Sequence, residues 1–236
     1  MAEPPTADEP APDAGNPPRV SRLSSHEILD AAVLMFARKG YKATNLGDVA
    51  RELGVTRQAL YYYFPKKHDI LDALFTYVFN EVDKAVNEAD QPGQPAGDRF
   101  NAMYRAHVRT VMLYPAHLHL VLSEVRSLPE SSRQRASARR YKHQQRFVAA
   151  FDAAVREGSF AEVPPDFAVS ILLGAANSVF RWLNRVGPAD PEEMANRMQR
   201  FFAIGYVAPA GGAELNRVDR TPRPATADTE DATASP

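Results

Sequence analysis

The sequence predicts an all-α protein of nine helices, in which a small three-helix unit precedes a larger six-helix unit. Apolar residues recur at the three- and four-residue spacing of helices through most of the chain, and no stretch shows the sustained alternation of a strand. Glycine and proline stand where this spacing is interrupted. We expect the smaller unit to span residues 23–66 and the larger unit residues 67–208, between flanking segments 1–22 and 209–236.

The two flanking segments are expected to be a disordered arm and a disordered tail. Both are rich in proline, alanine, aspartate and threonine and contain almost no large apolar residue. Segments of this composition bury too little surface to offset the entropy that is lost when the chain is ordered. We therefore exclude residues 1–22 and 209–236 from the predicted fold.

The first helix of the small unit has a clear beginning and end. Ser24 and Glu27 have the spacing of a capping box, and Gly40 ends the helix. The residues predicted to form its buried stripe are Ile28, Ala32, Met35 and Phe36.

Two short helices around a glycine turn complete the small unit. Thr44 is predicted to cap the second helix, and Gly54 supplies the left-handed conformation that ends it. Thr56 then caps a third helix that runs to about Phe64.

Six longer helices are predicted for the larger unit. They are separated by the stretch QPGQPAG, by Tyr114-Pro115 and by further glycines and prolines. Their predicted ranges are 67–89, 98–114, 116–127, 130–157, 166–186 and 191–207.

Composition excludes several classes of protein. The chain has no cysteine, so it has neither a disulfide framework nor a thiol nucleophile, and we expect a cytoplasmic location. No apolar run approaches the roughly 20 residues of a membrane span, so no membrane partner is expected. We find no nucleophile with a base and an orienting group, and so no catalytic constellation. We also find no metal-ligand set, since His117 and His119 lie on different faces of a helix. The sequence thus predicts neither an enzyme nor a cofactor or metal site.

Residues 44–71 have the layout of a helix-turn-helix, whose second helix enters the DNA major groove. A helix–glycine–helix corner alone is also common in all-α proteins that do not bind DNA. The chain as a whole has a net charge of −1, but residues 22–67 contain eight basic and four acidic residues, which leaves +4. A local positive field of this kind favours DNA as a partner.

The same segment resembles the TetR family of bacterial one-component regulators. The family signature is a threonine, an apolar-alanine pair, Gly-Val-Ser/Thr, Leu-Tyr-Tyr-x-Phe and a lysine. The resemblance covers residues 24–75 closely and implies a DNA-binding domain over residues 23–66. The matching residues are Thr44, Val49-Ala50, Gly54-Val55-Thr56, Leu60-Tyr61-Tyr62-Tyr63-Phe64 and Lys67.

Eight residues are predicted to contact double-stranded DNA. Phosphates are expected at Thr44, Thr56, Tyr62 and Lys67. Base edges are expected at Arg57, Gln58, Ala59 and Tyr61, with the alanine suited to a thymine methyl group.

A stripe of small residues predicts a close helix contact near the C-terminus. Ser170, Gly174 and Ser178 recur every four residues, and the stripe suits packing either within one subunit or against a second. In the TetR family the last two helices form a four-helix bundle with those of a second subunit. One recognition helix reads few bases, so we expect a homodimer on a palindromic operator. The predicted interface residues are Ser170, Gly174, Ser178, Met198 and Phe201.

The larger unit is expected to bind a small hydrophobic effector that releases the DNA. Each polar group among the candidates is also suited to pairing with a neighbour. The candidate effector-binding residues are Met103, His107, Arg126, Arg139, Phe147, Asn177, Arg181 and Trp182.

A basic stripe narrows the class of effector. Arg135, Arg139, Lys142 and Arg146 lie at helical spacing, which suits either a solvated face or an anionic ligand. The stretches SEVRSLPESSRQRASARRYK and LLGAANSVFRWLNRVGPADPEEMA are similar to an actinobacterial TetR subgroup that senses acyl-coenzyme A thioesters of fatty-acid or sterol breakdown. The resemblance therefore implies a repressor released by such a thioester. The alternative is a repressor of a multidrug efflux pump that responds to hydrophobic cations.

Overall fold

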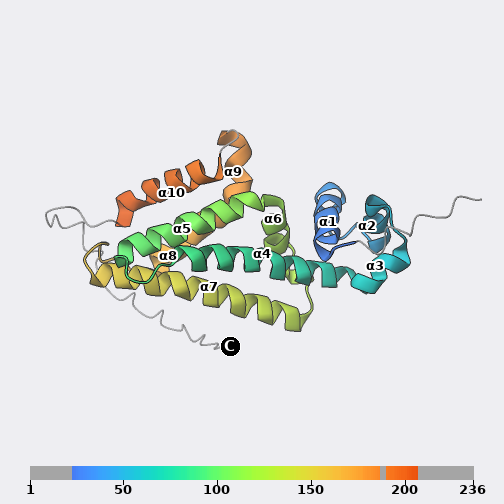
Figure 1. Ribbon diagram of the computed structural model, residues 1–236, viewed down its shortest axis with the longest axis horizontal. Coiled ribbons are helices and arrows are strands. Elements are labelled where there is room, and N and C mark those ends of the chain that lie inside the picture. The colour runs from blue at the N-terminus through green and yellow to red at the C-terminus, as the bar shows by residue number, and fades with distance from the viewer. Residues whose placement is uncertain (1–22, 187–189, 207–236) are drawn as a thin grey trace, which may run out of the picture.

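The computed structural model describes residues 23–186 and 190–206, which form ten α-helices and one short 3-10 helix (Figure 1). No β-strand occurs within these two ranges, so the all-α prediction is confirmed for the described residues. In chain order the helices are α1 (Ser25–Lys39), α2 (Leu46–Leu53), α3 (Arg57–Tyr63), α4 (Lys67–Ala89), α5 (Ala96–Leu113), α6 (Pro115–Ser123), η2 (Val125–Ser127), α7 (Glu130–Arg156), α8 (Pro165–Asn177), α9 (Val179–Val186) and α10 (Pro191–Tyr206).

One predicted helix, residues 166–186, is divided into α8 and α9. The break lies at Ser178, whose backbone N–H and side-chain hydroxyl both donate to the Ala175 carbonyl, at 3.2 and 2.9 Å. A serine hydroxyl that competes for a backbone carbonyl favours a tighter turn over continued α-helix. This break accounts for the tenth helix.

Local signals fix the ends of the first three helices. The capping box of Ser24 and Glu27 is present, and Gly54 ends α2 with a φ of 67° and a ψ of 30°. Thr56 caps α3 by accepting the Ala59 N–H at 3.2 Å. The predicted cap of α2 is wrong by one position, because Asn45 rather than Thr44 is its N-cap.

Helices α1 to α3 form a small lobe, and α4 runs from this lobe along the larger lobe formed by α5 to α10 (Figure 1). Helix α5 lies at the centre of the larger lobe, where it packs against α4, α7, α8 and α10. Fully buried aromatic side chains from α5 and α7 form the middle of this core. They are Phe100, Tyr104, Phe147 and Phe151.

The segments 1–22 and 209–236, for which we expect disorder, lie outside the described residues. Within residues 23–186 and 190–206, no helix combines the length and the apolar character that crossing a membrane requires.

Candidate nucleic-acid interface and effector region

Helix α3 presents one exposed face that is suited to DNA. Arg57, Gln58, Tyr61 and Tyr62 are exposed, and their spacing places them on the same side of the helix. Tyr62 is 85% exposed, which is unusual for an aromatic side chain in a free protein. These four predicted contact residues are therefore brought together on one accessible surface.

The same helix buries Ala59, which was predicted to face a base edge. Ala59 is only 8% exposed, as it lies on the side of α3 that also buries Leu60. The prediction misjudged the rotation of a seven-residue helix, since periodicity alone does not fix which small residue faces inward.

Thr44 is also inside the protein rather than on the DNA-facing surface. It is 2% exposed, and its hydroxyl donates to the Gly40 carbonyl at 2.9 Å and lies 3.3 Å from the Met35 carbonyl. These bonds hold the loop that leads from α1 into α2. A hydroxyl buried in this way does not reach a phosphate without a rearrangement of the loop.

Lys67, the first residue of α4, binds the loop between α1 and α2. Its Nζ lies 2.6 Å from the Tyr41 carbonyl, 3.1 Å from the Lys42 carbonyl and 2.8 Å from the Thr44 carbonyl. It also lies 4.4 Å from the centre of the Tyr41 ring. Burial lowers the pKa of Lys67 from its usual value. The three donors of the ammonium group are thus used inside the protein. The sequence had instead suggested that Lys67 contacts a phosphate.

The beginning of α2 carries a charged cluster that the sequence analysis did not single out. The Asn45 and Asp48 side chains form a reciprocal capping box, which an Asn-x-x-Asp pattern indicates in a sequence. One oxygen of Asp48 also lies 3.0 Å from Lys39 Nζ and 3.2 Å from Arg51 Nη1. The hydrogen bond from the Asn45 backbone, followed by that from Lys39, lowers the pKa of Asp48 to about 2.

In the larger lobe, three of the predicted effector residues belong to one hydrogen-bonded chain. His107 Nε2 lies 3.1 Å from Asn177 Oδ1, and His107 Nδ1 lies 3.2 Å from His143 Nε2. His143 Nδ1 lies 2.9 Å from Asp83 Oδ1. Arg139 completes the chain, with Nη2 at 2.8 Å from Asp83 Oδ2. The chain links α8, α5, α7 and α4, and no sequence pattern relates Asp83 to His143, because 60 residues separate them.

Burial determines the protonation state of His107 in this hydrogen-bonded network. His107 is 3% exposed, and burial, followed by the charge of His143, lowers the pKa of His107 to about 3. Neutral His107 carries one N–H, so it donates Nε2–H to Asn177 Oδ1 and accepts at Nδ1 from His143 Nε2. Although burial raises the pKa of Asp83, the hydrogen bonds from His143 and Arg139 outweigh it and leave that pKa below its usual value.

The other predicted effector residues are dispersed. Met103 and Phe147 are fully buried in the packed core, and Phe147 contacts the rings of His107 and His143. Trp182 on α9 is half-buried against the core. The remaining two, Arg126 and Arg181, are exposed.

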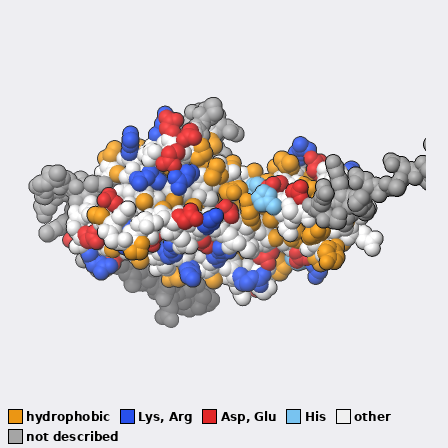
Figure 2. All heavy atoms as spheres, viewed as in Figure 1, with side chains coloured by type: hydrophobic (Ala, Val, Ile, Leu, Met, Phe, Trp, Pro, Cys, Tyr) orange, Lys and Arg blue, Asp and Glu red, His pale blue; other side chains and the backbone are white. Residues whose placement is uncertain are grey.

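The basic stripe of α7 is partly neutralised by acids of α4. Arg135 Nη2 lies 2.7 Å from Asp72 Oδ2, and Arg139 binds Asp83 as described. Figure 2 shows the same mixture on the face it presents, where basic and acidic side chains alternate over the larger lobe. Two cations of the stripe, Lys142 and Arg146, have no ion pair within the described residues.

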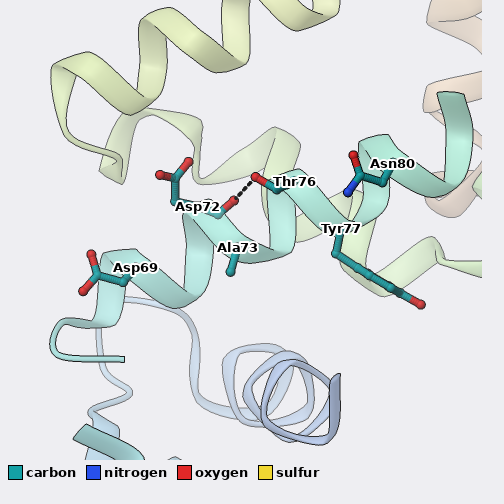
Figure 3. A pocket seen from close by; sticks show the side chains of 6 residues that line it. All are labelled: Asp69, Asp72, Ala73, Thr76, Tyr77 and Asn80. Atoms are coloured by element: carbon teal, nitrogen blue, oxygen red, sulfur yellow. Dashed lines mark hydrogen bonds between the residues drawn. The ribbon is translucent and has the colours of Figure 1, made fainter. Parts of the chain in front are cut away.

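A groove of about 440 Å³ runs along the outer side of α4 (Figure 3). Two carboxylates and one aromatic ring lie on it, and the Asp72 carboxylate already accepts hydrogen bonds from Ser132 and Arg135. The groove therefore carries acidic groups and differs from the predicted effector region in the core. Its lining residues are Asp69, Asp72, Ala73, Thr76, Tyr77 and Asn80.

Two helices at the C-terminal end expose apolar side chains. Phe167 and Ile171 on α8 are exposed beside the predicted small-residue stripe, in which Ser170 and Gly174 are also exposed and Ser178 is half-buried. On α10, Phe201 is 71% exposed and Ile204 is also exposed. Met198, which was predicted to lie in the same interface, is instead buried within the chain.

The two lobes are joined by a polar cluster that the sequence analysis missed. Asp30 on α1 lies 3.1 Å from His117 Nε2 on α6 and 3.1 Å from His26 Nδ1. His26 Nε2 in turn lies 2.7 Å from the Tyr77 hydroxyl on α4, which donates to the Tyr114 hydroxyl at 3.2 Å. The cluster therefore ties the position of α1 to those of α4 and α6.

Comparison with known proteins agrees with this architecture. Residues 28–74 match the family profile "Bacterial regulatory proteins, tetR family", and residues 93–205 match "Tetracyclin repressor-like, C-terminal domain". The transcriptional repressor KstR2 of Mycolicibacterium smegmatis is 25% identical over 205 residues, which is 82% of this chain and 93% of KstR2.

Two solved structures have the same fold. A bacterial regulatory protein of the TetR family from Rhodococcus RHA1 superposes with a TM-score of 0.73 at 25% identity, covering 79% of this chain and 97% of that one. AibR, solved in complex with isovaleryl coenzyme A and operator DNA, superposes with a TM-score of 0.66 at 22% identity, covering 75% and 96%. The chain therefore belongs to the TetR family and is a DNA-binding, ligand-responsive transcriptional repressor of that family rather than an enzyme.

Proposed function

We propose that the protein acts in the cytoplasm as a homodimer that binds a palindromic DNA operator and is released by an acyl-coenzyme A thioester of lipid or sterol breakdown. The observation that carries the DNA part is the exposed face of α3, where four side chains with hydrogen-bonding groups or aromatic rings lie together. A face of this kind has no packing role within the chain and suits the floor of a major groove.

The roles on this face follow from position along α3. The N-terminal residues of a recognition helix contact base edges, which assigns Arg57 and Gln58, with Tyr61 one turn later. Thr56 and Tyr62 lie at the edges of the face and are assigned to phosphates. The Thr56 side-chain oxygen accepts the capping bond, so its O–H is left to donate to a phosphate oxygen.

The homodimer is proposed from the exposed apolar side chains of α8 and α10. Large apolar side chains clustered on a surface mark an interaction site. A second copy of this chain suits the surface, because a twofold axis there also supplies the second recognition helix that a palindrome requires. Gly174 lies in the middle of the α8 face, and a methyl group placed on it would meet nothing within 4 Å in the single chain, so a partner helix has room to approach.

The effector class is proposed from the residue types of the larger lobe. The acyl part of a thioester requires an apolar interior, which the aromatic core around Phe147 supplies, and its phosphates require cations, which α7 supplies at Lys142 and Arg146. A protein of the same fold, AibR, was solved with isovaleryl coenzyme A and operator DNA. Entry of the acyl part has to separate helices that are packed together in this structure, and this separation provides the differential affinity that release of DNA requires.

The groove on α4 favours a second candidate, a repressor that responds to hydrophobic cations. Asp69 and Tyr77 together suit a cation that also stacks on an aromatic ring. Against this, the nearby Asp72 is already paired with Arg135.

Selection of binding sites from random DNA by the purified protein tests the proposal. We expect an inverted repeat whose half-sites are separated by about one helical turn, 34–36 Å, or a multiple of it. Arg57→Ala should weaken the selected site by about 1–3 kcal/mol and relax base preference within each half-site. Recovery of no preferred sequence, or of a single unrepeated half-site, would contradict the proposal.

A further inference from the structure

Gly47, in the first turn of α2, lies directly against the guanidinium group of Arg57. A methyl group placed on Gly47 would lie 2.5 Å from Arg57 Nε and 2.8 Å from both Cζ and Nη2. A Cβ atom essentially never lies less than 3.0 Å from a non-bonded heavy atom of another part of the chain. The guanidinium therefore occupies the space that a side chain at position 47 would take.

The backbone does not require glycine at this position. Gly47 lies in a regular helix and its φ is not positive, so alanine fits the same backbone. Glycine favours a helix less than alanine does, because it loses more backbone entropy when it is ordered. The chain thus tolerates a poor helix former at a position where the atoms nearest to an added methyl group all belong to the Arg57 guanidinium.

The contact holds Arg57 without using its donors. Arg57 forms no hydrogen bond or ion pair within the described part of the chain, and the nearby Asp48 is engaged by Lys39 and Arg51. A guanidinium has five N–H donors, all of which are left for DNA. An arginine side chain loses rotamer entropy when it is fixed, and confining it beforehand reduces that loss on binding.

We propose that Gly47 is a specificity-determining position for DNA recognition and that it acts by positioning Arg57. The proposal rests on the operator binding proposed above. Arg57 is the first residue of the recognition helix, and a bidentate guanidinium contact depends on the direction from which the group approaches the base. Gly47 sets that direction from the neighbouring helix without touching the DNA itself.

The test is a double-mutant cycle of Gly47→Ala and Arg57→Ala, with the ratio of affinities for the selected operator and for random DNA as the readout. Gly47→Ala should fold with unchanged or higher thermal stability, because the displaced atoms are the end of a flexible side chain. Its operator-to-random ratio should fall by about tenfold, at the base pairs that Arg57→Ala also affects. In the Arg57→Ala background, Gly47→Ala should cause no further change in the ratio.

Glu52→Ala is the matched control, since it introduces alanine on an exposed part of the same helix and should leave the ratio unchanged. The proposal is overturned if Gly47→Ala keeps the wild-type ratio, or if it lowers the ratio equally in the Arg57→Ala background. If Gly47→Ala does not fold, the double variant must fold, because it lacks the Arg57 side chain with which the alanine clashes. Failure of both variants to fold would also overturn the proposal. A wild-type protein without any sequence preference would refute operator binding itself, which is a different outcome.

Discussion

The Asp30 carboxylate on α1 and the His117 imidazole on α6 join the small lobe to the larger lobe, with Asp30 Oδ1 at 3.1 Å from His117 Nε2. Burial lowers the pKa of His117 even though the Asp30 hydrogen bond opposes this shift, so the neutral ring donates Nε2–H to the carboxylate. The other Asp30 oxygen lies 3.1 Å from His26 Nδ1. The Asp30 carboxylate on α1 therefore accepts from a histidine of each lobe, and a shift of α6 moves the His117 donor that holds α1.

A double-mutant cycle on this pair should show an energetic coupling between the lobes. Asp30→Asn and His117→Gln, combined, should reveal an interaction of about 0.5–1 kcal/mol in urea unfolding, because the pair is only partly screened by solvent. The cycle of Asp98→Asn with His117→Gln is the control, since Asp98 is an exposed acid on α5. Strict additivity of the Asp30 and His117 variants would exclude a coupling through this bond.

Acidification should destabilise the protein through His107. Its folded-state pKa of about 3 lies below the usual 6.5, so between these values the unfolded chain binds the extra proton. The contribution of neutral His107 to the free energy of unfolding is therefore fully present above pH 6.5. It falls as the pH drops, by at most about 1.4 kcal/mol per pH unit. The partly buried His117 contributes in the same direction.

Urea unfolding of the wild type and of His107→Gln at pH 7.5, 6.5 and 5.5 measures this effect. The variant should show a smaller loss of stability on acidification, because glutamine retains a donor toward Asn177 but does not titrate. Parallel pH profiles for wild type and His107→Gln would show that another group is responsible.

Lys67 should contribute to the stability of the DNA-binding lobe rather than mainly to phosphate binding. Lys67→Met removes the donor to three carbonyls of the loop between α1 and α2 and should cost about 1–3 kcal/mol in urea unfolding. Lys66→Met removes the same charge from an exposed neighbour and should leave the unfolding free energy nearly unchanged. If the two variants are equally stable and differ only in the salt dependence of DNA binding, Lys67 is a phosphate contact after all.

Disruption of the apolar surface of α8 should separate the proposed dimer. Ile171→Asp places a charge on an exposed apolar surface, which the single chain tolerates but a buried interface does not. Sedimentation equilibrium should show a dimer for the wild type and a monomer for this variant. Leu113→Asp, at another exposed apolar residue, should remain dimeric. A monomeric wild type, or a dimeric Ile171→Asp, speaks against this surface.

The fluorescence of Trp182, the only tryptophan of the chain, should report the binding of an acyl-coenzyme A. The side chain is half-buried against the core that the acyl part has to open. A long-chain acyl-coenzyme A should change this fluorescence and weaken operator binding by about 5- to 150-fold, the range of a coupling of 1–3 kcal/mol. Free coenzyme A is the control for the phosphate part alone. A response to ethidium, a hydrophobic cation, with none to the thioester would favour the efflux alternative.

Much of the DNA-binding lobe was predictable, because its signals are local. The capping box of Ser24 and Glu27, the left-handed Gly54 and the Thr56 cap each depend on a few neighbouring residues, and the structure contains all three. The misplaced cap of α2 shows the limit of such signals. Thr44 and Asn45 are adjacent and both suited to capping, and the loop buries the first while the second forms the box.

The sequence by itself determined an all-α protein with a helix-turn-helix of the TetR family, since helical periodicity, caps and turn glycines act within a few residues of each other. Only the tertiary structure decided where individual side chains are used. It turned Ala59 toward the core, directed Lys67 to three backbone carbonyls and brought Asp83 to His143 across 60 residues. It also placed the Arg57 guanidinium over Gly47. These outcomes depend on how the packed helices are rotated and how closely they approach one another. Contacts between segments that lie far apart in the sequence decide this packing, so local residue spacing does not predict it.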